Sequence, residues 1–64
     1  MLKKNLFNIE FPIALSIINM ELRDYYSHIK ILCDDEEIDY IALCDFFSRN
    51  GYEYSEKINQ FILK

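Results

Sequence analysis

Shortness is the feature that most constrains the fold of this chain. Its 64 residues leave room for one domain around one small core, and a chain of this size buries only about 60% of the surface that it exposes when unfolded. Hydrophobic residues make up 52% of the chain, which is enough for a packed globule and argues against disorder. We therefore expect a single domain over residues 1–64, with marginal stability unless an oligomer or a bound partner adds to it.

Disulfides and metal ions, the usual supports of a very small core, are not indicated by the sequence. Cys33 and Cys44 form no CxxC pair, and His28 is the single histidine, so we expect neither a metal site nor a cofactor. Both cysteines lie among apolar neighbours and are interpreted as small core residues with reduced thiols. No run of about 18 apolar residues is present, so no membrane segment is expected, and the protein is predicted to be cytoplasmic.

The longest predicted helix covers residues 12–26. Pro12 suits its first turn because proline lacks the N–H that a helix start leaves unpaired, and apolar side chains then follow at helical spacing. Charged residues are predicted on the opposite face: Glu21, Arg23 and Asp24. Three apolar side chains lie off the core stripe: Leu15, Met20 and Tyr26. This surplus leaves two interpretations open, cover by an N-terminal arm over residues 1–11 or an interface, including a homodimer through helix 12–26.

Two shorter helices and a hairpin are predicted to follow. Ser27 is the candidate N-cap of a helix over about residues 28–36, and Asp39 is the candidate N-cap of a third helix. Asn50 and Gly51 are expected to end that third helix. The alternating pattern after it predicts a β-hairpin over residues 52–62. Three helices over residues 12–51 and this hairpin make a mainly α, helix-turn-helix-like domain of the winged-helix type.

Four parts of the chain are similar to a known family. They are Pro12, Asn19–Tyr26, Leu32–Asp35, and Gly51–Tyr54 with Asn59–Phe61. In these parts the chain resembles the family of short bacterial proteins designated domain of unknown function 4250, over about residues 12–61. The resemblance implies a shape and a bacterial or phage origin, without an activity or a catalytic residue. The chain departs from the family at Glu36, where members tend to have a leucine before the turn between the second and third helices.

Two charged residues of these family-like parts are expected to have a scaffold role. Arg23 and Asp24 are adjacent, and adjacent residues on a helix do not face each other. We therefore expect them to tie the first helix separately to the hairpin and to the second helix, with Arg23 reaching backbone carbonyls or Tyr54.

Carboxylates are concentrated where the helix-turn-helix pattern is strongest. Five of the eight residues in Cys33–Tyr40 are acidic, and the formal net charge of the chain is −4. Asp39, Tyr40 and Asp45 are predicted on the surface that a helix-turn-helix turns toward DNA, where carboxylates repel phosphates. The third predicted helix carries one base, Arg49. We therefore expect nucleic acid to be a poor partner.

Catalysis finds little support in the residues present. His28 and Cys33 are five positions apart, whereas a spacing of about four stacks two side chains on one helix face. The chain has a single glycine, so a phosphate-cradling loop cannot be built. We predict that the chain is not an enzyme and has no catalytic residues.

The leading hypothesis is a small acidic protein-interaction module that binds through an acidic, tyrosine-bearing surface. The candidate partner-binding residues are Asp34, Asp35, Glu37, Asp39, Tyr40 and Asp45. The expected partner is a protein with a basic surface, and the hypothesis extends to a bacterial or phage regulator or inhibitor of a nucleic-acid-handling protein. Two alternatives stay open: a winged helix-turn-helix DNA-binding protein acting as a dimer, and a solvated acidic face without a binding role.

Overall fold

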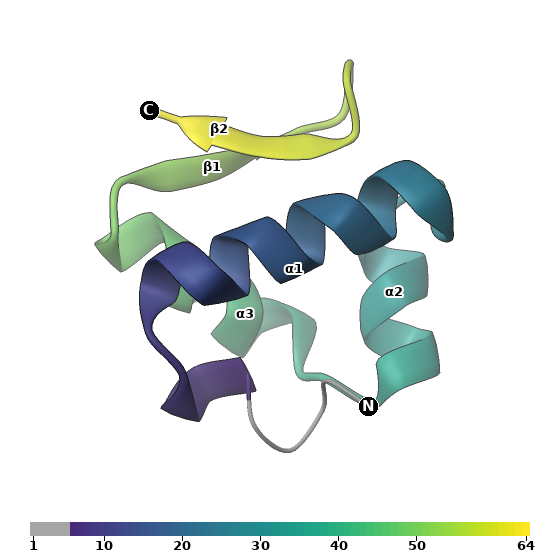
Figure 1. Cartoon of the computed structure of the whole chain (residues 1–64). Helices are drawn as coiled ribbons and strands as arrows, with labels where there is room; N and C mark the ends of the chain where they lie inside the picture. Colours follow the sequence, from purple (N-terminus) through teal and green to yellow (C-terminus); the bar gives the residue numbers. More distant parts are fainter. Residues whose placement is uncertain (1–5) are drawn as a thin grey trace.

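Residues 6–64 are described by a computed structural model, which consists of three helices followed by a two-stranded hairpin (Figure 1). The elements are η1 (Leu6–Asn8), α1 (Phe11–Asp24), α2 (Ile29–Glu36), α3 (Tyr40–Arg49), β1 (Tyr52–Ser55) and β2 (Gln60–Leu63). The predicted mainly helical fold with a C-terminal hairpin is therefore confirmed. Of the predicted arm, residues 1–5 lie outside the described residues, and the rest includes the 3-10 turn η1.

Helix α1 is the longest helix and packs against β2 and α2. It begins one residue earlier than predicted, so Pro12 is its second residue, and it ends at Asp24 rather than at residue 26. One stripe of the helix is buried: Ala14, Ile18, Leu22 and also Glu21. The prediction that Glu21 lies on the solvent face is wrong, because only 5% of this residue is exposed. Burial, and then the nearby carboxylates of Glu36 and Asp24, raise the pKa of Glu21.

Each of the two shorter helices starts at a side chain that caps it. The α2 cap is His28 rather than the predicted Ser27, since the His28 Nδ1 accepts the N–H of Lys30 at 3.0 Å. The α3 cap is Asp39, as predicted, whose carboxylate accepts the N–H of Ile41 at 3.0 Å. Gly51 follows the end of α3 with φ +87°, a backbone conformation that glycine adopts without strain.

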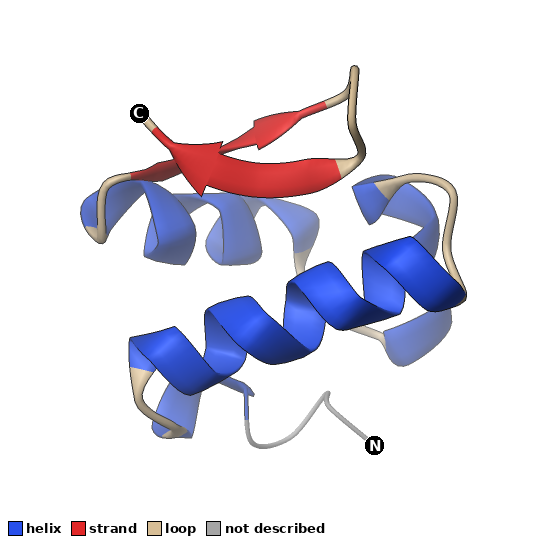
Figure 2. Cartoon of the chain, turned by 45° about the horizontal axis from the view of Figure 1, so that its top comes forward, coloured by secondary structure: helices blue, strands red, loops and turns tan. Residues whose placement is uncertain are grey.

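The hairpin lies over the helices, with β2 toward α1 and β1 toward α3 (Figures 1 and 2). Its strands are antiparallel, and the register pairs Tyr52 with Leu63 and Tyr54 with Phe61. The hairpin therefore reaches one residue beyond the predicted end at residue 62. Phe61 is buried, and its ring centroid lies 4.3 Å from that of Phe47 on α3.

The core combines aliphatic residues from all three helices with a group of aromatic rings. Phe11 stands edge-on to Phe46 and to Phe47, with ring centroids 5.7 and 5.0 Å apart. Cys33 is buried and Cys44 is half-buried, and both thiols are free. Burial raises the pKa of Cys33 to about 11, so this thiol stays protonated at neutral pH.

The apolar surplus predicted on the first helix is only partly covered. Leu15 and Tyr26 are half-buried, whereas Met20 remains 40% exposed and Ile13, on the same outer side of α1, is exposed as well. Among residues 6–64, none of the helices has both the length and the apolar character needed to cross a membrane.

Candidate interaction surface

The six predicted partner-binding residues lie along the second half of α2, the turn after it, and α3. We call this set the acidic ridge: Asp34, Asp35, Glu37, Asp39, Tyr40 and Asp45. All of the carboxylate-bearing members are exposed, and Tyr40 is half-buried. The structure thus places the predicted residues on one connected stretch of backbone that includes the turn between α2 and α3.

The acids at the end of α2 stand where a helix disfavours negative charge. Asp34, Asp35 and Glu36 occupy its last turn, which contains no basic residue. The C-terminus of a helix carries a partial negative charge, so each carboxylate there costs about 0.3–1 kcal/mol when it is not neutralised. Glu37 adds a second cost, because it caps the helix in the left-handed region at φ 60° and ψ 43°, where a residue with a Cβ is strained.

Two contacts hold this unfavourable helix end in place. The Tyr26 hydroxyl donates to Asp35 at 2.5 Å and to Glu36 at 3.2 Å, and these two carboxylates raise the pKa of Tyr26, Asp35 foremost. Ile38 is buried in the turn, and its N–H donates to the Cys33 carbonyl at 2.8 Å. Ile38 thus supplies an apolar anchor beside Glu36, the position at which the resemblance led us to expect a leucine.

Three ridge residues also make contacts that stabilise the fold. Asp39 caps α3, and Asp45 accepts hydrogen bonds from the Arg49 guanidinium, at 2.8 Å for Nε. Tyr40 lies beneath the Lys30 ammonium, which is 5.5 Å from the ring centroid. Burial, followed by the neighbouring Cys44, raises the pKa of Tyr40. Asp34, by contrast, makes no side-chain hydrogen bond or ion pair within residues 6–64.

The outer side of α3 is the surface that a helix-turn-helix turns toward DNA. Its first turn presents Ile41, which is 70% exposed, and Ala42. Its one base, Arg49, is engaged by Asp45 one helical turn away. This side of α3 therefore offers apolar surface and a neutralised ion pair, rather than the free arginines and lysines that bind phosphates and guanine edges.

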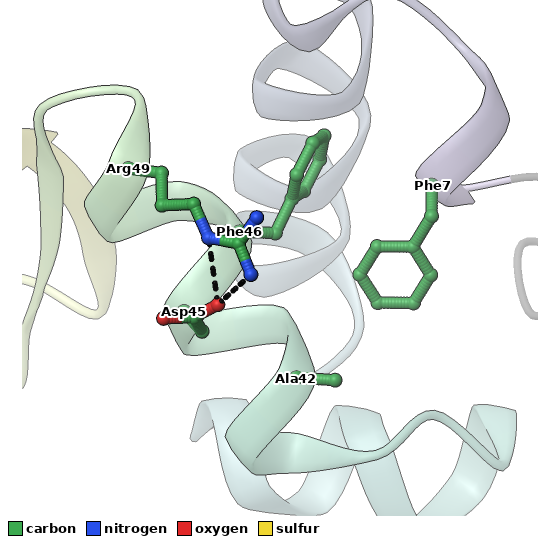
Figure 3. Close-up of a pocket in the computed structure, with 5 residues that line it drawn as sticks. All are labelled: Phe7, Ala42, Asp45, Phe46 and Arg49. Carbon is green, nitrogen blue, oxygen red and sulfur yellow. Dashed lines mark hydrogen bonds and ion pairs between the residues drawn. The ribbon is translucent and has the colours of Figure 1, made fainter.

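A shallow hollow beside α3 was not predicted from the sequence. It has a volume of about 320 Å³ and is lined by Phe7, Ala42, Asp45, Phe46 and Arg49. Figure 3 shows the Asp45–Arg49 ion pair on one side and the Phe7 ring on the other. The four α3 residues recur at helical spacing, a signal that the sequence does contain. Phe7 comes from η1, and nothing in the local pattern indicates that it packs edge-on against Phe46, with centroids 5.4 Å apart.

The polar side chains near these helices form no metal site in the part of the chain that the structure describes. Within residues 6–64, no group of three or more His, Cys, Asp or Glu side chains is placed to hold a metal ion. The one imidazole, His28, uses Nδ1 to cap α2, while Nε2 lies 3.4 Å from the Glu56 carboxylate. His28 thus has a structural role at the start of α2.

The predicted scaffold role of Arg23 and Asp24 is wrong. The Arg23 Nε donates to the Asp24 carboxylate at 3.0 Å, so the two residues bond to each other and remain exposed. The side chains of these two adjacent residues are long enough to meet at the surface despite their adjacency.

The connection between α1 and the hairpin is made instead by other residues of the family-like parts. We call these four residues the polar clamp: Asn19, Tyr54, Asn59 and Gln60. The Asn19 side chain accepts the N–H of Phe61 at 2.8 Å and donates to its carbonyl at 3.1 Å. The Gln60 side-chain amide donates a hydrogen bond to the Asn19 backbone carbonyl at 2.9 Å.

Asn59, directly before β2, completes the clamp at the C-terminal end of α1. Its amide donates to the carbonyls of Leu22 and Tyr26 at 3.0 and 2.8 Å, which lie at the end of α1. It accepts the Tyr54 hydroxyl at 2.5 Å and itself adopts the left-handed conformation, φ 56°, which asparagine tolerates better than most residues. The family-like residues at these positions therefore join two elements of the fold.

Comparison with known proteins agrees with the family-like parts of the sequence. A family model described as Domain of unknown function (DUF4250) matches residues 9–61. No curated protein and no solved structure matches the chain at a significant level.

Proposed function

The chain belongs to the DUF4250 family, whose description assigns no activity, and we propose that it is a non-enzymatic protein-interaction module that binds through the acidic ridge. The observation that carries the proposal is the placement of charge at the end of α2. Asp34, Asp35 and Glu36 stand in the last helical turn, and Glu37 follows in a strained conformation. Natural proteins tend to depart from such local stability preferences at functional sites.

The charge of the ridge defines the chemistry of the expected partner. Exposed carboxylates attract a basic protein surface, speed its association and make binding weaker as salt rises. Tyr40, with the Lys30 ammonium near its ring, adds the kind of rigid amphipathic side chain that is enriched in protein interfaces. We extend the proposal to a bacterial or phage regulator or inhibitor that acts in the cytoplasm and covers the basic surface of a nucleic-acid-handling protein.

DNA binding by a dimer is the competing function, and the helix-turn-helix arrangement of α2 and α3 favours it. The proposed dimer contact is the outer side of α1, where Ile13 and Met20 are exposed. Against it stand the Asp45–Arg49 pair on the outer side of α3 and the repulsion between ridge carboxylates and phosphates. An experiment must therefore separate a protein partner from a nucleic acid.

The test compares two variants that remove the same amount of charge. The ridge variant Asp34→Asn/Asp39→Asn loses two carboxylates and keeps the α3 cap, because asparagine caps as well as aspartate. The control variant Glu10→Gln/Asp24→Asn loses two exposed carboxylates from the ends of α1. Each protein is tagged at the N-terminus and incubated with bacterial lysate, with and without nuclease treatment, and bound proteins are quantified by mass spectrometry.

We expect a stoichiometric basic protein that survives nuclease and elutes with salt. The ridge variant should bind this partner about tenfold more weakly, and the control variant should bind it like the unmodified protein. Recovery that depends on nucleic acid, together with a gel shift of random duplex that the ridge variant strengthens, contradicts the proposal and supports DNA binding. Equal recovery by both variants contradicts the role of the ridge.

A further inference from the structure

The hairpin leaves one strand edge without a neighbour in residues 6–64. The Lys64 N–H donates to the Gly51 carbonyl at 2.9 Å, which makes these two opposite residues a hydrogen-bonded pair. Hydrogen-bonded and non-hydrogen-bonded pairs alternate along an antiparallel ladder. In the observed register, Tyr52 and Tyr54 therefore belong to non-hydrogen-bonded pairs, and their backbone N–H and C=O groups point away from β2.

The same alternation accounts for the other edge of the hairpin. Phe61, opposite Tyr54, points its N–H and C=O away from β1, and the Asn19 side chain bonds to both groups, at 2.8 and 3.1 Å. Helix α1 thus closes the edge of β2 at this position.

Among the described residues, 6–64, the edge of β1 has no such partner. No hydrogen bond within residues 6–64 reaches the backbone of Tyr52 or Tyr54 from outside the hairpin. The strand is held firmly, because the Tyr52 ring packs on Phe11, with centroids 5.3 Å apart, and the Tyr54 ring packs on His28 at 5.1 Å. Two N–H and two C=O groups are therefore presented in a fixed, extended geometry.

An exposed strand edge is a template for an added strand. We propose that β1 takes an extended segment of a basic protein as an antiparallel third strand, with a lysine or arginine of that segment opposite Glu53. The partner residues before and after this base form the hydrogen-bonded pairs with Tyr52 and Tyr54. The base and Glu53 then form a non-hydrogen-bonded pair, in which opposite side chains approach most closely.

The charge of Glu53 favours a basic segment over a second copy of the chain at the edge of β1. Glu53 is exposed and makes no side-chain hydrogen bond or ion pair within residues 6–64. Antiparallel pairing of β1 with β1 of another copy, by the same backbone groups, places Glu53 opposite Glu53. Like charges in directly opposite positions destabilise a strand pair, whereas unlike charges stabilise it.

The inference rests on the proposed function, from which it takes the basic protein as the partner. It adds to the acidic ridge a second contact, which is made by backbone groups of β1. The segment that fits has the pattern apolar, basic, apolar, because its alternate side chains face the same side as the Tyr52 and Tyr54 rings. The backbone bonds supply affinity, and Glu53 supplies selectivity for a base.

The test uses three capped peptides and NMR spectra of the whole protein. They are Thr-Val-Lys-Val-Thr, the same peptide with both valines N-methylated, and Thr-Val-Glu-Val-Thr. The lysine peptide should move the Tyr52 and Tyr54 amide signals saturably and slow their hydrogen exchange. N-methylation should abolish binding, since it removes the two donors. The variant Glu53→Lys should bind the lysine peptide about fivefold more weakly and should bind the glutamate peptide better.

The inference is overturned if the lysine peptide shows no saturable shifts at these amides up to about 5 mM, or if the N-methylated peptide binds equally well. Binding of the partner captured from lysate, measured for the Glu53→Lys protein and for the ridge variant, distinguishes this inference from the proposed function. If the Glu53→Lys protein retains that partner and the ridge variant loses it, the edge inference fails and the ridge proposal stands. Loss by Glu53→Lys alone supports the edge and contradicts the ridge, and retention by both contradicts both.

Discussion

The polar clamp and the acidic ridge are both made of polar side chains, but their surroundings differ. In the clamp, Asn19 and Asn59 are half-buried, and their amides bond to backbone groups far away in the sequence. In the ridge, carboxylates such as Asp34 face solvent at a helix end that disfavours them. The difference teaches that the clamp residues hold the fold together through half-buried contacts, whereas the ridge carboxylates are exposed and available for binding.

The largest effect is expected from breaking the clamp at Asn59. Replacement Asn59→Ala removes two donors to the carbonyls of Leu22 and Tyr26 and the acceptor for Tyr54. Half-buried polar groups are left without partners, so the free energy of unfolding should fall by about 3 kcal/mol in urea denaturation.

The replacement Asn59→Gly is the matched control for the backbone. Glycine adopts φ 56° without strain, so the glycine variant should be more stable than the alanine variant and less stable than the unmodified protein. A loss below about 0.5 kcal/mol in the alanine variant contradicts the structural role of the clamp.

A smaller loss is expected where the ridge serves the fold. Replacement Asp39→Ala removes the cap of α3, whose carboxylate accepts the N–H of Ile41, and should cost about 1 kcal/mol. Asp39→Asn should leave stability unchanged, because the amide oxygen accepts the same bond. Thermal unfolding of the two variants distinguishes a role of the cap from a role of the charge; equal losses point to the charge.

A gain in stability is expected at the strained end of α2. Replacement Glu37→Gly relieves a residue held at φ 60° and removes a carboxylate from a helix C-terminus, so the protein should become about 0.5–1 kcal/mol more stable. Glu37→Gln keeps the backbone strain and isolates the contribution of charge. Loss of stability in the glycine variant shows that the Glu37 side chain supports the turn.

The smallest effect is expected at the Arg23–Asp24 pair. Both residues belong to the family-like parts, yet their ion pair is exposed, and exposed pairs contribute little. Arg23→Ala should change the free energy of unfolding by less than about 0.5 kcal/mol. A larger loss of unfolding free energy in urea denaturation contradicts this expectation and supports the scaffold role that was predicted for Arg23 from the sequence.

Local pattern predicted the elements of this fold better than their contacts. Helical spacing, the Asp39 cap and the Asn50–Gly51 end mark the helices because each signal acts within a few residues. The amide of Asn19 meets Phe61 across 42 positions of sequence, and such a contact leaves no periodic trace. Glu21 was misplaced for a related reason, since helical spacing cannot tell how wide a face the neighbouring elements cover.

The candidate surface was predictable in composition and not in detail. The carboxylates of the ridge are exposed as expected, but the roles of Asp35, Asp39 and Asp45 depend on where Tyr26, the α3 backbone and Arg49 lie. The hollow beside α3 requires Phe7 from another element.

The measurement that tests the central claim most directly is the free energy of unfolding of the ridge variant Asp34→Asn/Asp39→Asn. If the ridge is kept for binding and the clamp for folding, this variant should be as stable as the unmodified protein, or more stable by up to about 1 kcal/mol, because a charge leaves the end of α2 and the α3 cap is retained. A loss of more than about 1 kcal/mol contradicts the claim and makes the acidic ridge a structural feature like the clamp.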